Sequence, residues 1–174
     1  MSNEEEFEGL RGNDFENYFR KVDIVFPLFL SVVAINDIPL IFPPRHFVIC
    51  NLSERHLKGS HWMVILRISE TEFEIFNSLG QTDLNYIKPY FNFDIELNID
   101  FNVNSVQSES SKNCGYFCIY FIVFRILNLD MALQTILEDI FYTNDLIKND
   151  EIVTQFCNNI LTSTNDDFFC FHDF

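Results

Sequence analysis

An unbroken apolar run, Cys114 to Phe124, constrains the fold of this chain more than any other segment. The run stops at Arg125, so it is too short to span a bilayer. Its length instead predicts a helix that continues to about Leu127 and is buried on most sides. We expect the rest of the chain to supply the layers that bury this helix.

Strand patterns precede this run, and helical patterns follow it. Trp62–Ile68 and Phe73–Phe76 flank a polar turn and predict a β-hairpin. Further strands are expected within the apolar runs 24–34 and 46–51 and near 99–106. Other helices are predicted near 14–22, with Asp14 as N-cap, and at 83–91, 131–142 and 150–161. Together these elements predict an α+β fold whose helices gather mostly at the C-terminal end.

The length of 174 residues suits one domain with a substantial core. We expect a single domain over 14–161, a flexible acidic arm at 1–13 and a mobile tail at 162–174. The first residues are acidic and polar, unlike a secretory signal, which needs positive charge followed by an apolar run. No membrane association is expected.

Charge and cysteine content limit the partners and cofactors. Eleven basic residues stand against 26 acidic ones, and a net charge of −15 disfavours binding to nucleic acid. Five cysteines, an odd number, indicate free thiols in a reducing compartment. Cys114 and Cys118 lie four residues apart without a further set of metal ligands, so no metal and no cofactor is expected.

The tripeptide Asn113-Cys114-Gly115 stands where a polar loop enters the apolar helix. Asn113 is a good N-cap, and the positive end of the helix dipole beside Cys114 favours the thiolate. Gly115 would let a substrate backbone approach, and the free N–H groups can hold an oxyanion. Alternatively, Cys114 is only a small apolar residue entering a core helix, since free cysteines are often buried.

Three further residues complete a candidate catalytic site. His61 begins the first strand of the hairpin and is the best base among the four histidines. Asn77 ends the second strand, so the hairpin brings it beside His61, where its side-chain oxygen can fix the imidazole tautomer. Gln107 lies seven residues before Cys114, and its amide can complete an oxyanion hole.

The chain resembles the adenovirus endopeptidase (adenain) and its viral relatives in four motifs that follow one another in the same order. They are His61-Trp62, Phe76-Asn77-Ser78-Leu79-Gly80, Gln107 and Cys114-Gly115-Tyr116-Phe117-Cys118. The wider group includes the ubiquitin-like-protein-specific proteases. The resemblance covers about residues 20–130, and the spacing of seven from Gln107 to Cys114 is closer to adenain. It implies an adenain-like cysteine protease fold, with a central mixed sheet packed against the helix that begins at the nucleophile.

The resemblance also implies roles for individual residues. Cys114 would be the nucleophile, His61 the base, Gln107 the oxyanion donor and Trp62 the substrate-binding aromatic that follows the base. Asn77 occupies a place usually held by Asp or Glu, which puts the usual stabilisation of the imidazolium in doubt. The substrates implied are protein precursors of a virus, cleaved beside small residues such as Gly.

Activation is expected to differ from that of mammalian adenovirus enzymes, which use a disulfide-linked viral peptide and DNA. The segment 91–104 contains no cysteine for such a tether, and the net charge argues against DNA. The resemblance implies an intracellular protein, in the host nucleus or cytoplasm, that can be packaged in the virion.

Two other interpretations remain open at this point. The first is a protease that removes ubiquitin-like modifiers, which needs an exosite for a folded modifier. The second is a catalytically inactive relative with a structural or binding role in the virion. Asn77 favours this last interpretation, whereas His61, Gln107 and Cys114 oppose it.

Overall fold

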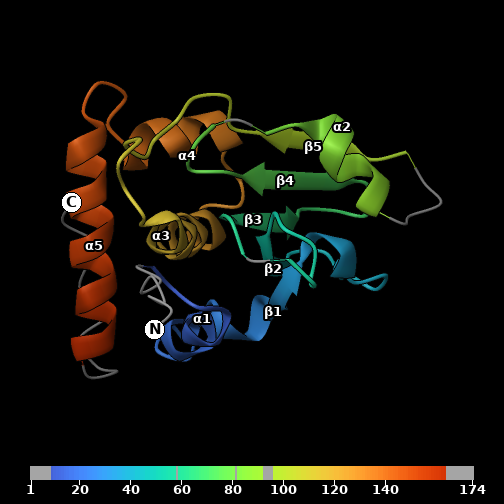
Figure 1. Cartoon of the computed structure of the whole chain (residues 1–174), viewed down its shortest axis with the longest axis horizontal. Helices are drawn as coiled ribbons and strands as arrows, with labels where there is room; N and C mark the ends of the chain where they lie inside the picture. Colours follow the sequence, from blue (N-terminus) through green and yellow to red (C-terminus); the bar gives the residue numbers. More distant parts are fainter. Residues whose placement is uncertain (1–8, 58, 81, 92–95, 164–174) are drawn as a thin grey trace, which may run out of the picture.

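A five-stranded mixed sheet with helices on one side forms the centre of the molecule (Figure 1). The computed structural model describes residues 9–57, 59–80, 82–91 and 96–163. The strands lie in sequence order: β1 (Phe29–Ala34), β2 (Phe47–Asn51), β3 (Trp62–Arg67), β4 (Glu72–Phe76) and β5 (Asn98–Phe101). The two outer pairs are parallel and the two inner pairs antiparallel. This arrangement confirms the predicted α+β class with a central mixed sheet.

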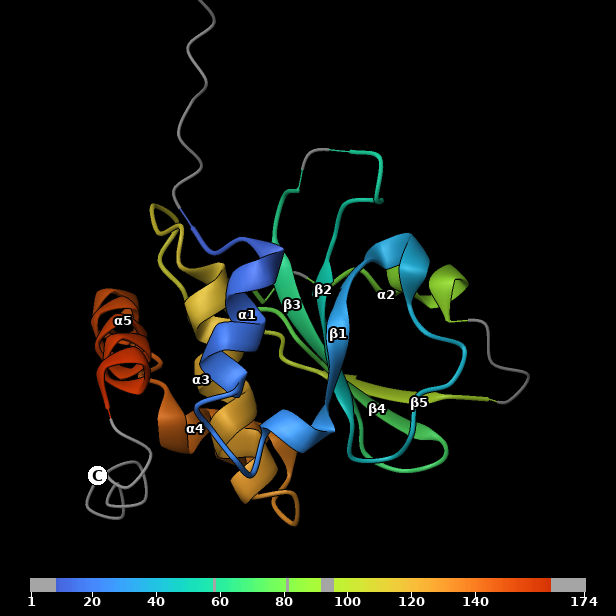
Figure 2. The same ribbon diagram turned by 90° about the horizontal axis from the view of Figure 1, so that it is seen from below.

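The helices lie mainly on one side of the sheet (Figure 2). That side carries α1 (Gly12–Phe19), α3 (Cys114–Leu127), α4 (Leu133–Ile140) and α5 (Leu146–Thr162). The short α2 (Leu84–Ile87) and the 3₁₀ turn after it (Lys88–Tyr90) cover the opposite side. In the described part of the chain, no helix is long and apolar enough to cross a membrane.

Strand residues alternate between two apolar layers, as the period of two in a β-strand requires. Val64 and Leu66 of β3 face the layer shared with α3, whereas Met63 and Ile65 face the layer that contains Ile87. Both faces of the sheet are therefore buried, which explains the nearly continuous apolar runs of β2 and β3.

Helix α3 has the predicted bounds and is buried on most sides. It packs against β3 of the sheet and against α1, α4 and α5. Its one charged residue, Arg125, is buried and forms a bidentate ion pair with Glu74 of β4 at 2.7 and 2.8 Å. This pair fixes the far end of α3 to the sheet, while its first residue, Cys114, lies at the opposite end.

Of the two capping predictions, the one for Asp14 is wrong, and the one for Asn113 holds for its position but not through a side-chain hydrogen bond. The first helix begins at Gly12, and Asp14 lies at its third position, where the carboxylate accepts the backbone N–H of Arg11 at 2.7 Å. Asn113 does occupy the N-cap position of α3, but its side chain donates to the Thr154 hydroxyl at 3.2 Å and not to the helix. A tertiary partner thus replaces the local cap.

Other bounds differ by a few residues. Within the run 24–34 the strand begins only at Phe29, after a 3₁₀ turn at Phe26–Leu28, and β5 ends at Phe101, before the predicted 106. The last two helices are α4 and α5, close to the predicted 131–142 and 150–161. Most of the expected acidic arm (1–13) and tail (162–174) falls outside the described residues; in the parts described, α1 already begins at Gly12 and α5 ends at Thr162.

Candidate active site

The β3–β4 hairpin brings His61 beside Asn77, as predicted. Its register pairs Val64 with Phe76, so the residue just before β3 lies close to the residue just after β4. Nε2 of His61 and Oδ1 of Asn77 are 2.8 Å apart. Oδ1 also accepts the backbone N–H of Leu79 at 3.0 Å, which identifies it as the amide oxygen. Nε2 of His61 therefore carries the proton, and Nδ1 is left as the basic nitrogen.

The sulfur of Cys114 lies at the N-terminus of α3, beside the start of β3. The backbone N–H groups of Trp62, Gly115 and Cys114 itself act on this sulfur and lower the pKa of its thiol. Trp62 directly follows His61, so the backbone of His61 lies near this thiol. The side chain of Cys114 is half-buried, whereas Cys118, one turn along the same helix, is fully buried in the core.

Burial controls the ionisation of both groups. It raises the pKa of the Cys114 thiol above the ordinary 9.0, and the neighbouring N–H groups only oppose this effect. Burial also lowers the pKa of His61 below the ordinary 6.5, against the effect of the Asn77 hydrogen bond. The thiol pKa is thus raised, not lowered as the helix dipole alone predicts. Both shifts favour a neutral thiol and a neutral imidazole over the ion pair.

Gln107 is buried on the loop that leads to Cys114, and its side chain is held at both ends. Its Oε1 accepts the hydroxyl of Ser78 at 2.6 Å, and its Nε2 donates to the backbone carbonyl of Ser111 at 2.8 Å. The carbonyl of Ser78 in turn accepts the backbone N–H groups of Val106 and Gln107, at 2.9 and 3.1 Å. Ser78 therefore ties the end of β4 to the nucleophile loop.

Gly80 makes this close approach possible. It adopts a left-handed conformation with φ of 68°, and a Cβ there would lie 2.3 Å from the carbonyl carbon of Asn104. Its N–H donates to the carbonyl of Asn77 at 2.8 Å and so closes the turn that follows β4.

Trp62 and Gly115 both contact Leu10, which lies just before α1. The indole N–H of Trp62 donates to the Leu10 carbonyl at 2.9 Å. A Cβ on Gly115 would lie 2.9 Å from the Cβ of Leu10, so the glycine makes room for this side chain. The structure thus gives Gly115 a packing reason, and the approach of a substrate backbone to Gly115 stays a prediction.

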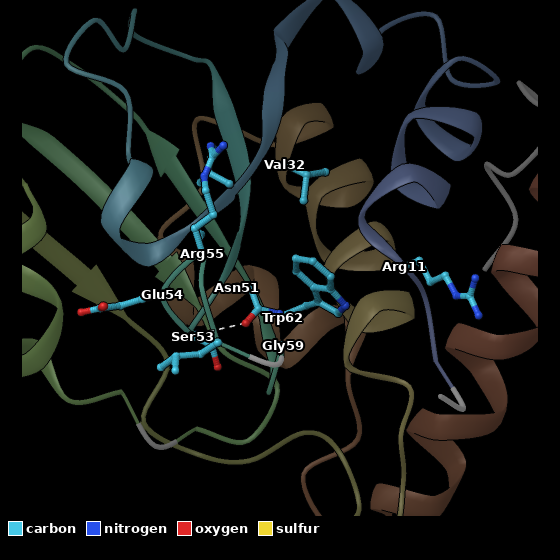
Figure 3. Close-up of a pocket in the computed structure, with 11 residues that line it drawn as sticks. Arg11, Val32, Asn51, Ser53, Glu54, Arg55, Gly59 and Trp62 are labelled. Atoms are coloured by element: carbon cyan, nitrogen blue, oxygen red, sulfur yellow. Dashed lines mark hydrogen bonds between the residues drawn. The ribbon is translucent and has the colours of Figure 1, made fainter. Parts of the chain in front are cut away.

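A pocket of about 410 Å³ opens next to Trp62 (Figure 3). Its lining combines apolar groups from β1 and β3 with polar groups of the loop that follows β2, and it includes Val32, Trp62, Asn51, Ser53, Glu54 and Arg55. The side chain of Asn51 accepts the backbone N–H of Ser53 at 2.9 Å and of Ser60 at 3.2 Å, which braces the loop that leads to His61.

Among the described residues, no group of three or more His, Cys, Asp or Glu side chains is placed to hold a metal ion. The four cysteines in that part of the chain are Cys50, Cys114, Cys118 and Cys157, and all are free.

Sequence reasoning missed the residues that support this site: Leu10, Ser78 and Asn102, whose side-chain amide bonds the backbone of Asn77. Ser78 stands directly after Asn77 in the quoted motif, so its place in that motif was a usable signal. Leu10 and Asn102 act through contacts with residues far along the chain, and no local pattern distinguishes them.

A mixed sheet packed on a buried helix that begins at a cysteine is the adenain-like cysteine protease fold, and a solved viral protease shares it with this chain. The solved structure of the ASFV pS273R protease superposes with a TM-score of 0.51 at 11% identity, over 88% of this chain and 68% of that chain. A Se-Met structure of the same protease gives a TM-score of 0.39 at 15% identity, over 68% and 45%. No protein family and no curated protein matches the sequence.

Proposed function

We propose that this protein is a cysteine endopeptidase in which Cys114 is the nucleophile and His61 the base. The observation that carries the proposal is the hydrogen bond from Nε2 of His61 to Asn77, at the start of the strand whose first N–H, that of Trp62, acts on the Cys114 thiol. The same His–Asn arrangement orients the imidazole in papain-like proteases. The fold shared with the ASFV pS273R protease supports the same class of reaction.

In the proposed reaction, Nδ1 of His61 takes the proton of the Cys114 thiol as substrate binds, which forms a thiolate–imidazolium pair. The thiolate attacks the carbonyl carbon of the scissile peptide, and a tetrahedral oxyanion forms. The imidazolium then gives its proton to the leaving amine, and a thioester remains on Cys114. Water hydrolyses the thioester with His61 again acting as base, which restores the thiol.

The oxyanion would lie between the N-terminus of α3 and Gln107. Backbone N–H groups at Cys114 and Gly115 precede the first hydrogen-bonded turn of the helix and carry its positive dipole. The amide of Gln107 has two hydrogens, and its bond to Ser111 uses one of them. The second can therefore be donated to the substrate oxygen.

The substrates we propose are protein precursors of a virus, cleaved beside small residues such as Gly. The viral origin of the ASFV protease supports this class. So does the resemblance to adenain. Leu10 packs on Gly115, the residue after Cys114, and accepts the indole N–H of Trp62, so bulky side chains near the nucleophile favour a small residue beside the scissile bond. The pocket next to Trp62 can then take a larger side chain of the same substrate.

The test is to profile a peptide library, with Gly and larger residues beside the scissile bond, using the wild type and Cys114→Ala. Cys118→Ala is a matched control, because Cys118 lies on the same helix but is buried in the core. We expect cleavage by the wild type and the control and none by Cys114→Ala. Residual turnover by Cys114→Ala, or an inactive wild type, would overturn the proposal. Reaction with a ubiquitin-like C-terminal warhead, without peptide cleavage, would assign the site to modifier removal.

A further inference from the structure

The side chain of Asn102 takes the place of a backbone partner where two strands part. Strands β4 and β5 are parallel, and Ile75 with Phe101 is the last pair of their register. Beyond it, Oδ1 of Asn102 accepts the backbone N–H of Asn77 at 2.9 Å, and Nδ2 of Asn102 donates to the backbone carbonyl of Asn77 at 2.7 Å. One amide thus bonds both backbone groups of Asn77.

We call the two hydrogen bonds from the Asn102 amide to the Asn77 backbone the Asn102 clamp. The clamp is buried, so its hydrogen bonds cannot be replaced by bonds to water. Asn102 is 2% exposed and Asn77 is 3% exposed. Nδ2 of Asn102 also donates to the carbonyl of Asn104 at 3.1 Å, which uses its second hydrogen. The carbonyl of Asn77 also accepts the Gly80 N–H at 2.8 Å, but a buried N–H that loses a partner cannot turn to water, so the Asn77 peptide would have to move to replace it.

The position of the Asn77 backbone decides where its side chain points. Asn102 holds that backbone. From there Oδ1 of Asn77 accepts two hydrogen bonds, one from the Leu79 N–H at 3.0 Å and one from Nε2 of His61 at 2.8 Å. A hydrogen bond weakens steeply when its distance and angle leave a narrow range. A small shift of Asn77 would therefore release the imidazole.

We infer that Asn102 is a positioning residue, which holds Asn77 so that His61 keeps its Nε2 proton and presents Nδ1 to Cys114. The inference rests on the proposed function for its catalytic consequence. That Asn102 holds Asn77, and that Asn77 sets the tautomer of His61, is inferred from the hydrogen bonds and does not require the protein to be a protease.

A primary amide of this length is required for the role. Aspartate at 102 would accept the Asn77 N–H but could not donate to the carbonyls of Asn77 and Asn104. Leucine has a similar shape and makes neither kind of bond. Asn102→Asp therefore removes the two bonds that Nδ2 donates, and Asn102→Leu removes all the hydrogen bonds of the side chain.

The experiment measures the His61 tautomer by ¹⁵N NMR of the imidazole nitrogens, with resonances assigned by comparison with His61→Gln. We expect the Nε2–H form in the wild type and a mixture of both tautomers in Asn102→Leu. Asn128→Leu is the matched control, because Nδ2 of Asn128 also donates to a backbone carbonyl, that of Phe124, but at the far end of α3. The control should keep the wild-type tautomer.

Kinetics then test the catalytic consequence by a double-mutant cycle. Asn102→Leu should lower kcat about tenfold with KM within about twofold, and it should change kcat less than about twofold in an Asn77→Ala background. If Asn102→Leu does not fold, Asn102→Asp should change kcat in the same direction.

A folded Asn102 variant with an unchanged His61 tautomer would overturn the inference. The inference would also fail if Asn102→Leu lowered kcat by the same factor in the wild type and in Asn77→Ala. If the wild type cleaves no peptide, the proposed function fails, but the NMR comparison still decides whether Asn102 positions the imidazole.

Discussion

The side-chain oxygen of Asn77 accepts a hydrogen bond from Nε2 of His61 at 2.8 Å, and this pair determines which imidazole nitrogen can act as a base. A neutral amide fixes the orientation of the ring as a carboxylate would, but it adds no negative charge. Burial therefore dominates the ionisation of His61, whose pKa is lowered. The resemblance to adenain places an acid at this position, so the charge of residue 77 can be tested by substitution.

Asn77→Asp should raise the pKa of His61. A carboxylate within hydrogen-bonding distance favours the imidazolium, and an opposite charge this close shifts a pKa by about 1–3 units. The ion pair with Cys114 then becomes easier to form, so we expect faster alkylation of Cys114 by iodoacetamide at pH 6–7. Titration of His61 by NMR and alkylation rates measured by mass spectrometry check both effects.

Asn77→Ala is the control for this prediction. It removes the acceptor of the His61 hydrogen bond without adding charge, so the pKa of His61 should fall further and alkylation should slow. Equal alkylation rates in Asn77→Asp and Asn77→Ala would show that residue 77 does not act on His61.

The parts of this site that follow from local patterns could be predicted from the sequence. The bounds of α3 follow from its apolar run, and the hairpin at 62–76 places His61 near Asn77 through a period of two and a short polar turn. Both depend on residues that are neighbours in the sequence.

The supports of the site could not be predicted, because they join residues far apart in the chain. Asn102 replaces a strand partner of Asn77, and Leu10 packs on Gly115 across more than a hundred residues. For the same reason the side chain of Asn113 does not bond the first turn of α3, because it donates to the hydroxyl of Thr154 on α5. Local preferences give the possible partners of a side chain, and the tertiary structure selects among them.

Gly115→Ala should destabilise the protein. A new Cβ would lie 2.9 Å from Cβ and 3.0 Å from Cδ1 of Leu10, so the segment before α1 must move. Overpacking of this kind costs about 1–3 kcal/mol, which exceeds the gain in helix propensity of about 1 kcal/mol from Gly to Ala. Thermal unfolding should show a lower Tm than in the wild type.

Leu10→Gly provides the second arm of that comparison. It removes the whole side chain that the new methyl group would meet, so the double variant should lose less stability than the two single effects added together. Additive effects would mean that Leu10 and Gly115 are not in contact in solution.

Arg125→Met should lower the free energy of unfolding by about 3–5 kcal/mol, since it leaves the buried Glu74 carboxylate without its partner. Glu74→Leu combined with Arg125→Met should recover most of this loss, because an apolar pair of similar volume needs no compensating charge. Urea unfolding of the single and double variants measures both. A single variant as stable as the wild type would contradict the buried ion pair.

The pH dependence of stability provides a test of the site that needs no substrate. Burial lowers the pKa of His61 below 6.5 in the folded protein. As the pH falls below 6.5, His61 is therefore protonated more in the unfolded chain than in the folded protein, and this difference favours unfolding. The contribution of His61 to stability is complete above pH 6.5 and is lost as pH falls through its folded pKa.

His61→Gln removes this titration while the other three histidines and the carboxylates stay in both proteins. The difference in unfolding free energy between wild type and variant should therefore be constant from pH 7 to 8. Below pH 6.5 the wild type should lose stability faster, by at most about 1.4 kcal/mol per pH unit. A difference that stays constant down to pH 5 would mean that the pKa of His61 is not lowered in the folded protein.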